Sequence, residues 1–407
     1  MPYQFINGTV TSPQGFTAAG ICCSIKPNNH TKRDLMLLFC DVPCNAAGVY
    51  TQNLVKSAAV LVTQQHLKNG RAQAVIANSG NANTCNAGGM EKANRMCDIA
   101  AKELQINPED VIVASTGVIG QVLPIEPIES KAEELFTLLS KAGGTDAAEA
   151  IMTTDTVKKE AAVTLTLSGK TVTIGGIAKG SGMIHINMGT MLSFLTTDAA
   201  VSSEMLYEAL KEAVGDSFNM VSVDGDTSTN DTLTIMASGK AGNDEITEKN
   251  EDYRAFVQAL TVLCKKLSKM LAGDGEGATK LLVCSVTGAK TKEDAKGVAK
   301  TIICSSLLKA AMFGADANWG RVLCAIGYSG CDVDIQKVDV AFASCKGTLP
   351  VCKNGAGIDF SEERAKEILS EKEITIEVAL NDGTYDAEAY GCDLTYDYIK
   401  INGDYRT

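Results

Sequence analysis

The 407-residue chain has little histidine: only His30, His66 and His185 are present, and none of its fourteen cysteines forms a C-x-x-C pair. Histidine and paired cysteine are the usual zinc ligands, and no H-E-x-x-H pattern occurs, so a zinc enzyme is disfavoured. The cysteines lie in apolar segments such as LLFCDVP and LLVCSV. This placement is typical of buried thiols rather than of disulfides or metal ligands.

Basic residues are also scarce, because 37 Lys and Arg stand against 49 Asp and Glu, which gives a net charge of −12. This balance repels phosphate backbones and anionic membranes, so neither nucleic acid nor a membrane is an expected partner. No stretch reaches the roughly 18 apolar residues that span a bilayer, and the N-terminal segment lacks the regions of a signal peptide. A cytoplasmic location is therefore expected.

Hydrophobic residues make up 45% of the chain and charged residues 21%, which is typical of a globular protein with a sizeable core. The length exceeds the roughly 250–300 residues at which one hydrophobic core usually stops growing. Two domains are therefore expected, with one large intertwined unit as the alternative. We find no internal repeat and no long linker.

Apolar runs rich in β-branched residues alternate with three- and four-residue apolar spacing, so the chain is expected to be a mixed α/β (α+β) protein. The polar stretch 239–252 is expected to be a surface loop. Expected strands are 74–78, 111–115, 161–167, 171–177, 232–237, 281–286, 374–380 and 393–401, and expected helices are 91–104, 203–214, 251–271, 292–312 and 361–369.

Two of these strands, 161–167 and 171–177, are separated only by Ser168, Gly169 and Lys170. Such a short connection containing glycine predicts a tight antiparallel hairpin. The hairpin leads directly into the glycine-rich sequence AKGSG at 178–182. Antiparallel sheet is therefore expected beside the richest motif of the chain.

The segment 179–199, KGSGMIHINMGTMLSFLTTDA, places glycines and hydroxyl residues before an apolar run that begins at Thr190. If the bond between Gly189 and Thr190 breaks, Thr190 gains an α-amino group with a pKa of about 7.7–8. That amine is suited to take the proton from the threonine hydroxyl, so one residue would be both nucleophile and base. Taken alone, a threonine that begins a buried strand is the commoner interpretation.

A second candidate lies in VIVASTGVIGQ at 111–121, where an apolar run ends in Thr116 and Gly117. A strand that stops in a turn of small residues presents backbone N–H groups and a hydroxyl, which are the donors of an oxyanion hole. An ordinary turn at a strand end is the alternative.

Two polar clusters, NSGNAN at 78–83 and DGDTSTND at 224–231, resemble ligand loops. Their side chains also form turns and caps that support neighbouring strands, and the second cluster lacks the complete calcium-loop pattern. Structural support of an active site is expected rather than metal binding.

These segments together resemble the ornithine acetyltransferase (glutamate N-acetyltransferase, ArgJ) family, and the likeness extends along the whole chain. AKGSGMIHINMGTMLSFLTTDA is similar to the family's processing site, although glycine stands at 189 where alanine is usual and isoleucine at 186 where proline is usual. The other matching segments, in order, are GFTAAG, NAAGVYTQN, AVIANSGNANTCNAG, ASTGVIGQ, MTTDT, VDGDTSTNDT, GDGEGATK, ADANWGR and NGDYRT.

The resemblance implies a layered helix/sheet/sheet/helix architecture of the ArgJ/DmpA-like type, with two interwoven domains. It implies self-cleavage at Gly189 and Thr190 into an N-terminal fragment, 1–189, and a C-terminal fragment, 190–407. The fragments would stay associated as a heterotetramer of two α and two β chains. Thr190 would be the nucleophile, and Thr116 and Gly117 would form the oxyanion hole.

The implied reaction belongs to arginine biosynthesis and moves acetyl from N-acetylornithine to glutamate through acetyl-Thr190. It needs no cofactor or metal, and acetyl-CoA stays open as a second donor. Lys179 suits the carboxylate of the donor and Glu276 its ammonium group. The family's substrate-contacting positions fall on Thr153, Lys179, Thr190, Glu276, Asn402 and Thr407.

Two alternatives stay open from the sequence. A self-processing aminopeptidase or amidase would use the same acyl-enzyme but resolve it with water. The contacts expected at Glu276, Asn402 and Thr407 favour transfer, because a hydrolase has little reason to keep contacts to ornithine. A binding or structural protein that has lost processing is the third interpretation.

Overall fold

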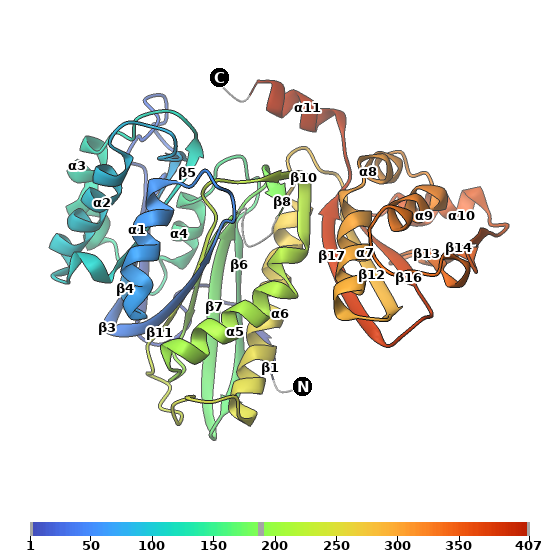
Figure 1. Ribbon diagram of the computed structural model, residues 1–407. Helices are drawn as coiled ribbons and strands as arrows, with labels where there is room; N and C mark the ends of the chain where they lie inside the picture. The colour runs from blue at the N-terminus through green and yellow to red at the C-terminus, as the bar shows by residue number, and fades with distance from the viewer. Residues whose placement is uncertain (1–2, 186–190, 405–407) are drawn as a thin grey trace. The chain divides into compact units, whose positions relative to one another are not determined.

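The structure, a computed structural model, describes residues 3–185 and 191–404, and Figure 1 traces the chain. The chain forms two compact units, and each unit is assembled from three separate segments. The first comprises residues 1–180, 187–215 and 227–267, and the second comprises 181–186, 216–226 and 268–407. The expected pair of interwoven domains is therefore confirmed. The compact units do not follow the boundary between residues 189 and 190.

The first unit contains a nine-stranded mixed sheet in the order β1-β6-β7-β9-β11-β3-β4-β5, with β2 paired to β3. Its strands are β1 (Tyr3–Ile6), β2 (Phe16–Ile21), β3 (Leu35–Tyr50), β4 (Arg71–Asn81), β5 (Val111–Val118), β6 (Lys159–Leu167), β7 (Lys170–Lys179), β9 (Leu192–Thr197) and β11 (Thr232–Ala237). Its helices are α1 (Ala58–His66), α2 (Gly89–Leu104), α3 (Glu126–Thr137), α4 (Gly144–Ala150), α5 (Ser203–Gly215) and most of α6 (Glu251–Gly273).

Strand β3 bends, and this bend lets one sheet form two layers. The register of its pairing with β4 shifts between Phe39 and Cys44. Pro43 lies at this irregularity, where its lack of an N–H group breaks no hydrogen bond between the strands. The half of β3 before the shift pairs with β2 and β4. After the shift, Cys44 and Asn45 still pair with β4, and residues 45–50 pair with β11.

A buried cluster fills the space between the two halves of the sheet. It joins Val75 of β4 and Ile112 of β5 to Ile177 of β7 and Phe194 of β9. Alternate residues of β4 and β5, such as Ile76, face a second cluster beneath α1, α2 and α3, which lie beside these strands in Figure 1. Burying each large side chain of this kind contributes roughly 1.5–3 kcal/mol.

Helix α6 covers the outer face of the other half. A Cβ placed on Gly176 of β7 would lie 3.2 Å from the side chain of Leu267 and 3.7 Å from that of Leu263. The glycine therefore lets the helix approach the strand closely. The expected helix/sheet/sheet/helix layering is confirmed within this unit.

The second unit contains an eight-stranded sheet in the order β15-β14-β13-β16-β12-β17-β10-β8. Its strands are β8 (Ile184–His185), β10 (Val221–Thr227), β12 (Leu281–Ala289), β13 (Asp339–Ser344), β14 (Gly347–Lys353), β15 (Ala356–Gly357), β16 (Glu373–Ala379) and β17 (Tyr385–Cys392). Its helices are α7 (Lys292–Cys304), α8 (Ser306–Phe313), α9 (Trp319–Gly327), α10 (Glu362–Leu369) and α11 (Tyr396–Gly403).

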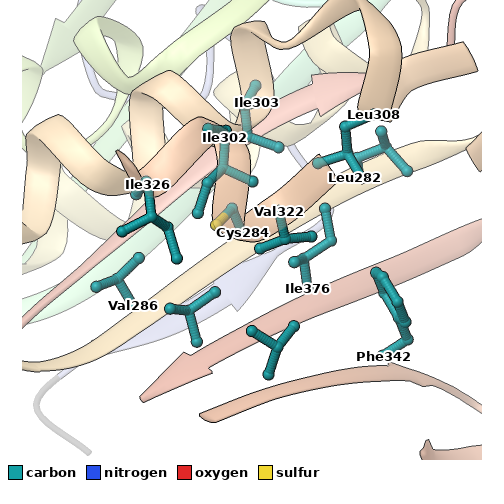
Figure 2. Close-up of a cluster of buried hydrophobic side chains, with 14 of the residues drawn as sticks. Leu282, Cys284, Val286, Ile302, Ile303, Leu308, Val322, Ile326, Phe342 and Ile376 are labelled. Atoms are coloured by element: carbon teal, nitrogen blue, oxygen red, sulfur yellow. The ribbon is translucent and has the colours of Figure 1, made fainter. Parts of the chain in front are cut away.

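The core of this unit lies between its sheet and helices α7 to α10. Figure 2 shows Ile302 and Ile303 of α7 close to Leu282 and Cys284 of β12, and all four side chains are at most 1% exposed. Cys284 is one of eight cysteines that are buried, and the structure contains all fourteen as free thiols. The expected buried thiols are therefore confirmed at these eight positions. No helix within the described residues is long and apolar enough to cross a membrane.

The expected hairpin is confirmed. Leu167 of β6 pairs with Lys170 of β7, and Ser168 and Gly169 between them have φ angles of 46° and 73°. Two consecutive left-handed residues are the signature of the two-residue turn that matches the twist of paired strands.

Two expected elements are wrong. The range 393–401 was expected to be a strand, but β17 ends at Cys392 and α11 follows, with the Thr395 side chain accepting a hydrogen bond from the Tyr398 amide. The range 292–312 was expected to be one helix, but it is broken at Ser305, whose extended backbone and side chain cap α8. In both places a local side-chain cap overrides the apolar pattern.

Candidate active site

The residues that the sequence singles out fall into two described groups. Thr116, Gly117, Thr153 and Lys179 belong to the first unit, and Glu276 and Asn402 belong to the second. Gly189, Thr190 and Thr407 lie outside the described residues, so their roles stay predictions.

The first group begins where β5 ends. Thr116 and Gly117 lie just before the last residue of this strand, which runs parallel to β4, and Gly117 pairs with Gly80. Gly117 has a φ of 134°, and a Cβ on it would lie 2.3 Å from the carbonyl carbon of Gly80. Only glycine fits here, because both the backbone angle and the approach of the two main chains exclude a side chain.

We expect Gly117→Ala to lower the turnover of the predicted acetyl transfer by about 100-fold or more. The added methyl group would push the strand end away from Gly80 and displace any backbone donor aimed at an oxyanion, and such a donor is worth about 10²–10³ in rate. Gly120→Ala is the matched control, since Gly120 also has a positive φ of 84° but nothing lies within 4 Å of its Cβ position. Equal effects of the two substitutions on kcat would contradict this interpretation.

Asn230 braces the same strand end. Its Nδ2 donates to the carbonyl oxygens of Ala82, at 2.6 Å, and Ser115, at 2.7 Å. Its Oδ1 accepts from the hydroxyls of Thr84, at 3.0 Å, and Thr229, at 2.6 Å. All four hydrogen-bonding positions of this buried carboxamide are used, so this residue of the polar cluster at 224–231 gives structural support, as the sequence predicted.

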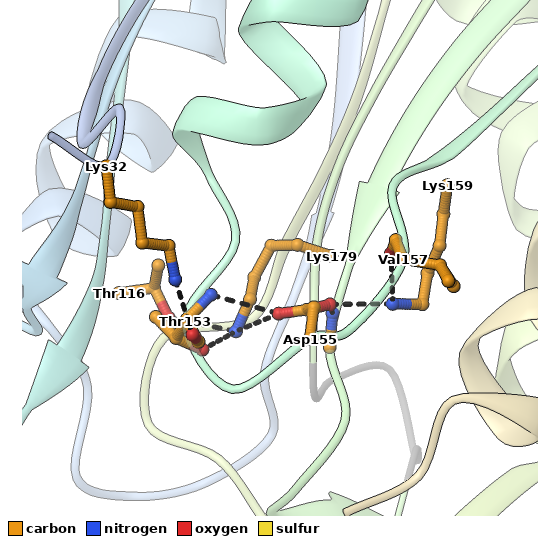
Figure 3. Close-up of polar contacts among 8 residues, drawn as sticks. Lys32, Thr116, Thr153, Asp155, Val157, Lys159 and Lys179 are labelled. Carbon is orange, nitrogen blue, oxygen red and sulfur yellow. Dashed lines mark hydrogen bonds and ion pairs between the residues drawn. The ribbon is translucent and has the colours of Figure 1, made fainter. Parts of the chain in front are cut away.

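Lys179, the last residue of β7, joins the predicted site residues of this unit (Figure 3). Its Nζ donates to the Thr153 hydroxyl at 2.8 Å and to the Thr116 hydroxyl at 3.4 Å. The residue is only 7% exposed, so its charge is largely shielded from water. The structure thus brings together three side chains that the sequence separates by up to 63 positions.

Asp155, which is not among the predicted site residues, holds this arrangement in place. Its carboxylate accepts from Lys159 Nζ at 2.7 Å, from the Gly180 amide at 2.7 Å and from the Thr153 amide at 3.0 Å. Burial by itself would raise the pKa of Asp155, but the Lys179 and Lys159 ammonium groups and these hydrogen bonds hold it well below its ordinary range. Asp155 therefore stays ionised and orients both sides of the site.

A second carboxyl, the last residue of the polar cluster at 224–231, lies beside Met191, which follows the predicted nucleophile. The Thr232 amide donates to the Met191 carbonyl at 2.9 Å, which places the preceding residue, Asp231, next to Met191. Burial raises the pKa of Asp231 well above its ordinary range, although a hydrogen bond from the Met191 amide acts in the opposite direction. Among the described residues, no hydrogen-bond partner reaches its Oδ2.

In the second unit, Glu276 is fixed from two directions. Its amide donates to the Ser181 carbonyl at 2.8 Å, and its Oε2 accepts from Asn402 Nδ2 of α11 at 2.8 Å. A Cβ on Gly182 would lie 2.3–2.6 Å from the Glu276 carboxylate group, so glycine is needed there to admit it. The structure therefore brings Glu276 and Asn402 together.

The segment before the predicted cleavage site is also anchored in this unit. The amides of Met183 and Ile184 donate to the Asp224 carboxylate at 2.6 and 2.8 Å. Burial raises the pKa of this carboxyl, while these hydrogen bonds oppose that shift. Asp224, in the cluster at 224–231, thus binds backbone amides.

Comparisons with known proteins cover almost the whole chain. A model of the ArgJ family matches residues 17–407. Arginine biosynthesis bifunctional protein ArgJ 1 of Clostridium acetobutylicum is 50% identical over 402 residues, 98% of each chain. The protein named arginine biosynthesis bifunctional protein ArgJ in Symbiobacterium thermophilum is 52% identical over 99% of this chain and 100% of its own. The crystal structure of ornithine acetyltransferase complexed with ornithine from Mycobacterium tuberculosis is 36% identical, covers 47% of this chain and 100% of its own, and has a TM-score of 0.42.

Proposed function

Because the chain belongs to the ArgJ family, we propose that it transfers acetyl from N-acetylornithine to glutamate through an acetyl-Thr190 intermediate. The observation that carries this proposal is the position of the Lys179 ammonium group, which contacts both Thr116 at the glycine-closed end of β5 and Thr153. A buried cation beside potential oxyanion donors suits a substrate that carries both a carboxylate and an acyl carbonyl.

The proposed enzyme first cleaves itself. The Thr190 hydroxyl oxygen attacks the Gly189 carbonyl, the peptide C–N bond breaks, and the hydroxyl proton passes to the departing Thr190 nitrogen, so the acyl group moves from nitrogen to oxygen. Water then hydrolyses the ester, which leaves a carboxylate on Gly189 and a free amine on Thr190. The products are the fragments 1–189 and 190–407.

The free amine then serves as the general base for acetyl transfer. It accepts the proton of the Thr190 hydroxyl while the oxygen attacks the acetyl carbonyl of N-acetylornithine. The Gly117 amide and the Thr116 hydroxyl donate to the oxyanion, and ornithine leaves with the proton. The amine of glutamate attacks the acetyl ester in turn, which regenerates Thr190 and releases N-acetylglutamate.

Charge supports this choice of donor. Lys179 suits the single carboxylate of N-acetylornithine, and Glu276, held by Asn402, suits its side-chain ammonium. Thr153 and Thr407 complete the proposed substrate contacts.

We expect Glu276→Gln to lower kcat/KM for N-acetylornithine by about 10- to 100-fold, mostly through KM, because it removes the charge that would pair with the ammonium. Transfer of acetyl from acetyl-Thr190 to glutamate should change much less, because glutamate has no side-chain ammonium. Glu248→Gln, at an exposed position in the loop before α6, is the control. A loss confined to kcat, or equal for both substrates, would contradict the assignment.

Other features of the proposal come from the family. The relatives are named bifunctional, which supports acetyl-CoA as a second acetyl donor. We propose that the two fragments remain together as a heterotetramer of two α and two β chains, that the enzyme acts in the cytoplasm, and that it uses neither a cofactor nor a metal.

The test is to incubate the purified protein with N-acetylornithine and labelled glutamate and to separate the products. Labelled N-acetylglutamate together with free ornithine is the expected result. Free acetate without N-acetylglutamate would instead identify a hydrolase of the aminopeptidase or amidase type.

A further inference from the structure

A second lysine reaches the candidate active site from a distant part of the chain. Lys32 lies in the loop between β2 and β3, and its Nζ donates to the Thr153 carbonyl at 2.6 Å (Figure 3). Lys179 donates to the hydroxyl of the same threonine. Both ammonium groups therefore contact Thr153, one at its carbonyl oxygen and the other at its hydroxyl, so they lie close to each other.

The loop holds Lys32 in a defined position. The Asn29 side chain accepts from the Lys32 amide at 3.0 Å and donates to the Lys32 carbonyl at 2.8 Å. It also donates to Asp34, whose buried carboxylate accepts from the amides of Cys23 and Ile25 at 2.6 and 2.8 Å. This bracing reduces the conformational entropy that the lysine would lose when it binds a ligand.

Lysines outnumber carboxylates among the charged side chains that Figure 3 labels around Thr153, although the whole chain is strongly acidic. The charged side chains labelled in Figure 3 are Lys32, Lys159, Lys179 and the single carboxylate Asp155. Asp155 lies 2.7 Å from Lys159 and 3.9 Å from Lys179, so its charge is already shared. Partial burial lowers the pKa of Lys32, and the charges of Lys179 and Lys26 also lower it, although the Asp155 and Asp34 carboxylates act in the opposite direction. An anion bound between Lys32 and Lys179 would remove their mutual repulsion.

The two proposed substrates differ in their charged groups. N-acetylornithine carries one carboxylate and one ammonium, which Lys179 and Glu276 would match. Glutamate carries two carboxylates, so the second needs a further cation. We propose that Lys32 selects the dicarboxylic acceptor by binding its second carboxylate while Lys179 binds the first. The inference rests on the proposed acetyl transfer and names a specificity residue for its second half.

The test separates the two half-reactions in Lys32→Met, which keeps an unbranched side chain but removes the charge. Release of ornithine from N-acetylornithine should stay within about two-fold of the wild type. Transfer of acetyl from acetyl-Thr190 to glutamate should lose about 10- to 100-fold in kcat/KM. This is the loss expected for a hydrogen bond between charged groups. Deacetylation by glutamine should change little, so the preference for glutamate over glutamine should shrink by the same factor.

Two further variants complete the experiment. Lys32→Arg should recover most of the preference for glutamate, and Lys68→Met, at an exposed lysine of the same unit, should behave as the wild type. Equal losses with glutamate and glutamine, or no loss with either, would overturn the role of Lys32 while leaving the proposed reaction intact. If the wild-type protein releases no ornithine, the proposed function fails and the inference fails with it.

Discussion

Replacing Thr190 with alanine is expected to abolish both chain cleavage and acetyl transfer. The alanine has no hydroxyl to attack the Gly189 carbonyl, and it cannot carry the acetyl group. A denaturing gel should show one band of 42.8 kDa in place of two fragments of about 20 and 23 kDa, in proportion to 189 and 218 residues. Turnover should fall by on the order of 10⁴-fold or more, as when other nucleophiles of covalent catalysis are removed.

Thr190→Ser is the informative comparison, because it keeps a hydroxyl and, after cleavage, an α-amine. It should cleave and transfer acetyl at a reduced rate. Thr137→Ala, at an exposed position in α3, controls for the loss of a threonine hydroxyl elsewhere. Cleavage of the Thr190→Ala chain at the wild-type rate would show that another residue attacks the bond.

Asp155→Asn is expected to lower the free energy of unfolding by about 3–5 kcal/mol, the usual cost of removing one partner of a buried ion pair. The side chains of Asp155 and Lys159 are fully buried, and that of Lys179 is 9% exposed, so asparagine would remove the carboxylate charge that these two shielded ammonium groups share. Chemical denaturation at neutral pH measures this loss. Activity should fall as well, because Lys179 would lose the carboxylate beside it.

The pH dependence of this loss has a defined sign. The folded state holds the pKa of Asp155 below its ordinary value of about 3.9, so the carboxylate stabilises the fold fully above that value. Its contribution is lost as the pH falls from there through the folded pKa. The stability gap between wild type and Asp155→Asn should therefore narrow in acid.

Asp146→Asn is the matched control for this comparison. Asp146 pairs with Arg33 at 3.0 Å, but its side chain is 45% exposed, and exposed pairs are worth about 0–1 kcal/mol. A loss in Asp155→Asn no larger than that of the control would contradict the role given to the buried network.

Seven of the eight expected strands coincide with strands of the structure, but other strands of both sheets were not predicted. β11 coincides with the expected range 232–237 because a short run of β-branched and apolar residues has no competing helical pattern. β3 was missed, since Pro43 interrupts its pattern and only the tertiary bulge explains how the strand continues. The range 393–401 was wrongly expected to be a strand because its aromatic and aliphatic residues alternate. Thr395 instead caps a helix there.

The site residues likewise fall into those that a local motif indicates and those that only the fold brings together. Thr116, Gly117, Thr153 and Lys179 were predicted through their motifs, and the structure places them together, while their roles stay predictions. Asp155 could have been noticed from its place two residues after Thr153 in MTTDT. Two other residues could not have been found, because the bond from Lys32 to Thr153 spans 121 positions and that from Asn230 to Ser115 spans 115. No local pattern tells a lysine or an asparagine which distant carbonyl it will contact.

The most direct test of the whole account is N-terminal sequencing of the purified, fully active protein, together with its mass under denaturing conditions. We expect two N-termini, one of which reads TMLSF and begins at Thr190, and two fragments in equal amounts. A single N-terminus and a single 42.8 kDa species with full acetyl-transfer activity would contradict it.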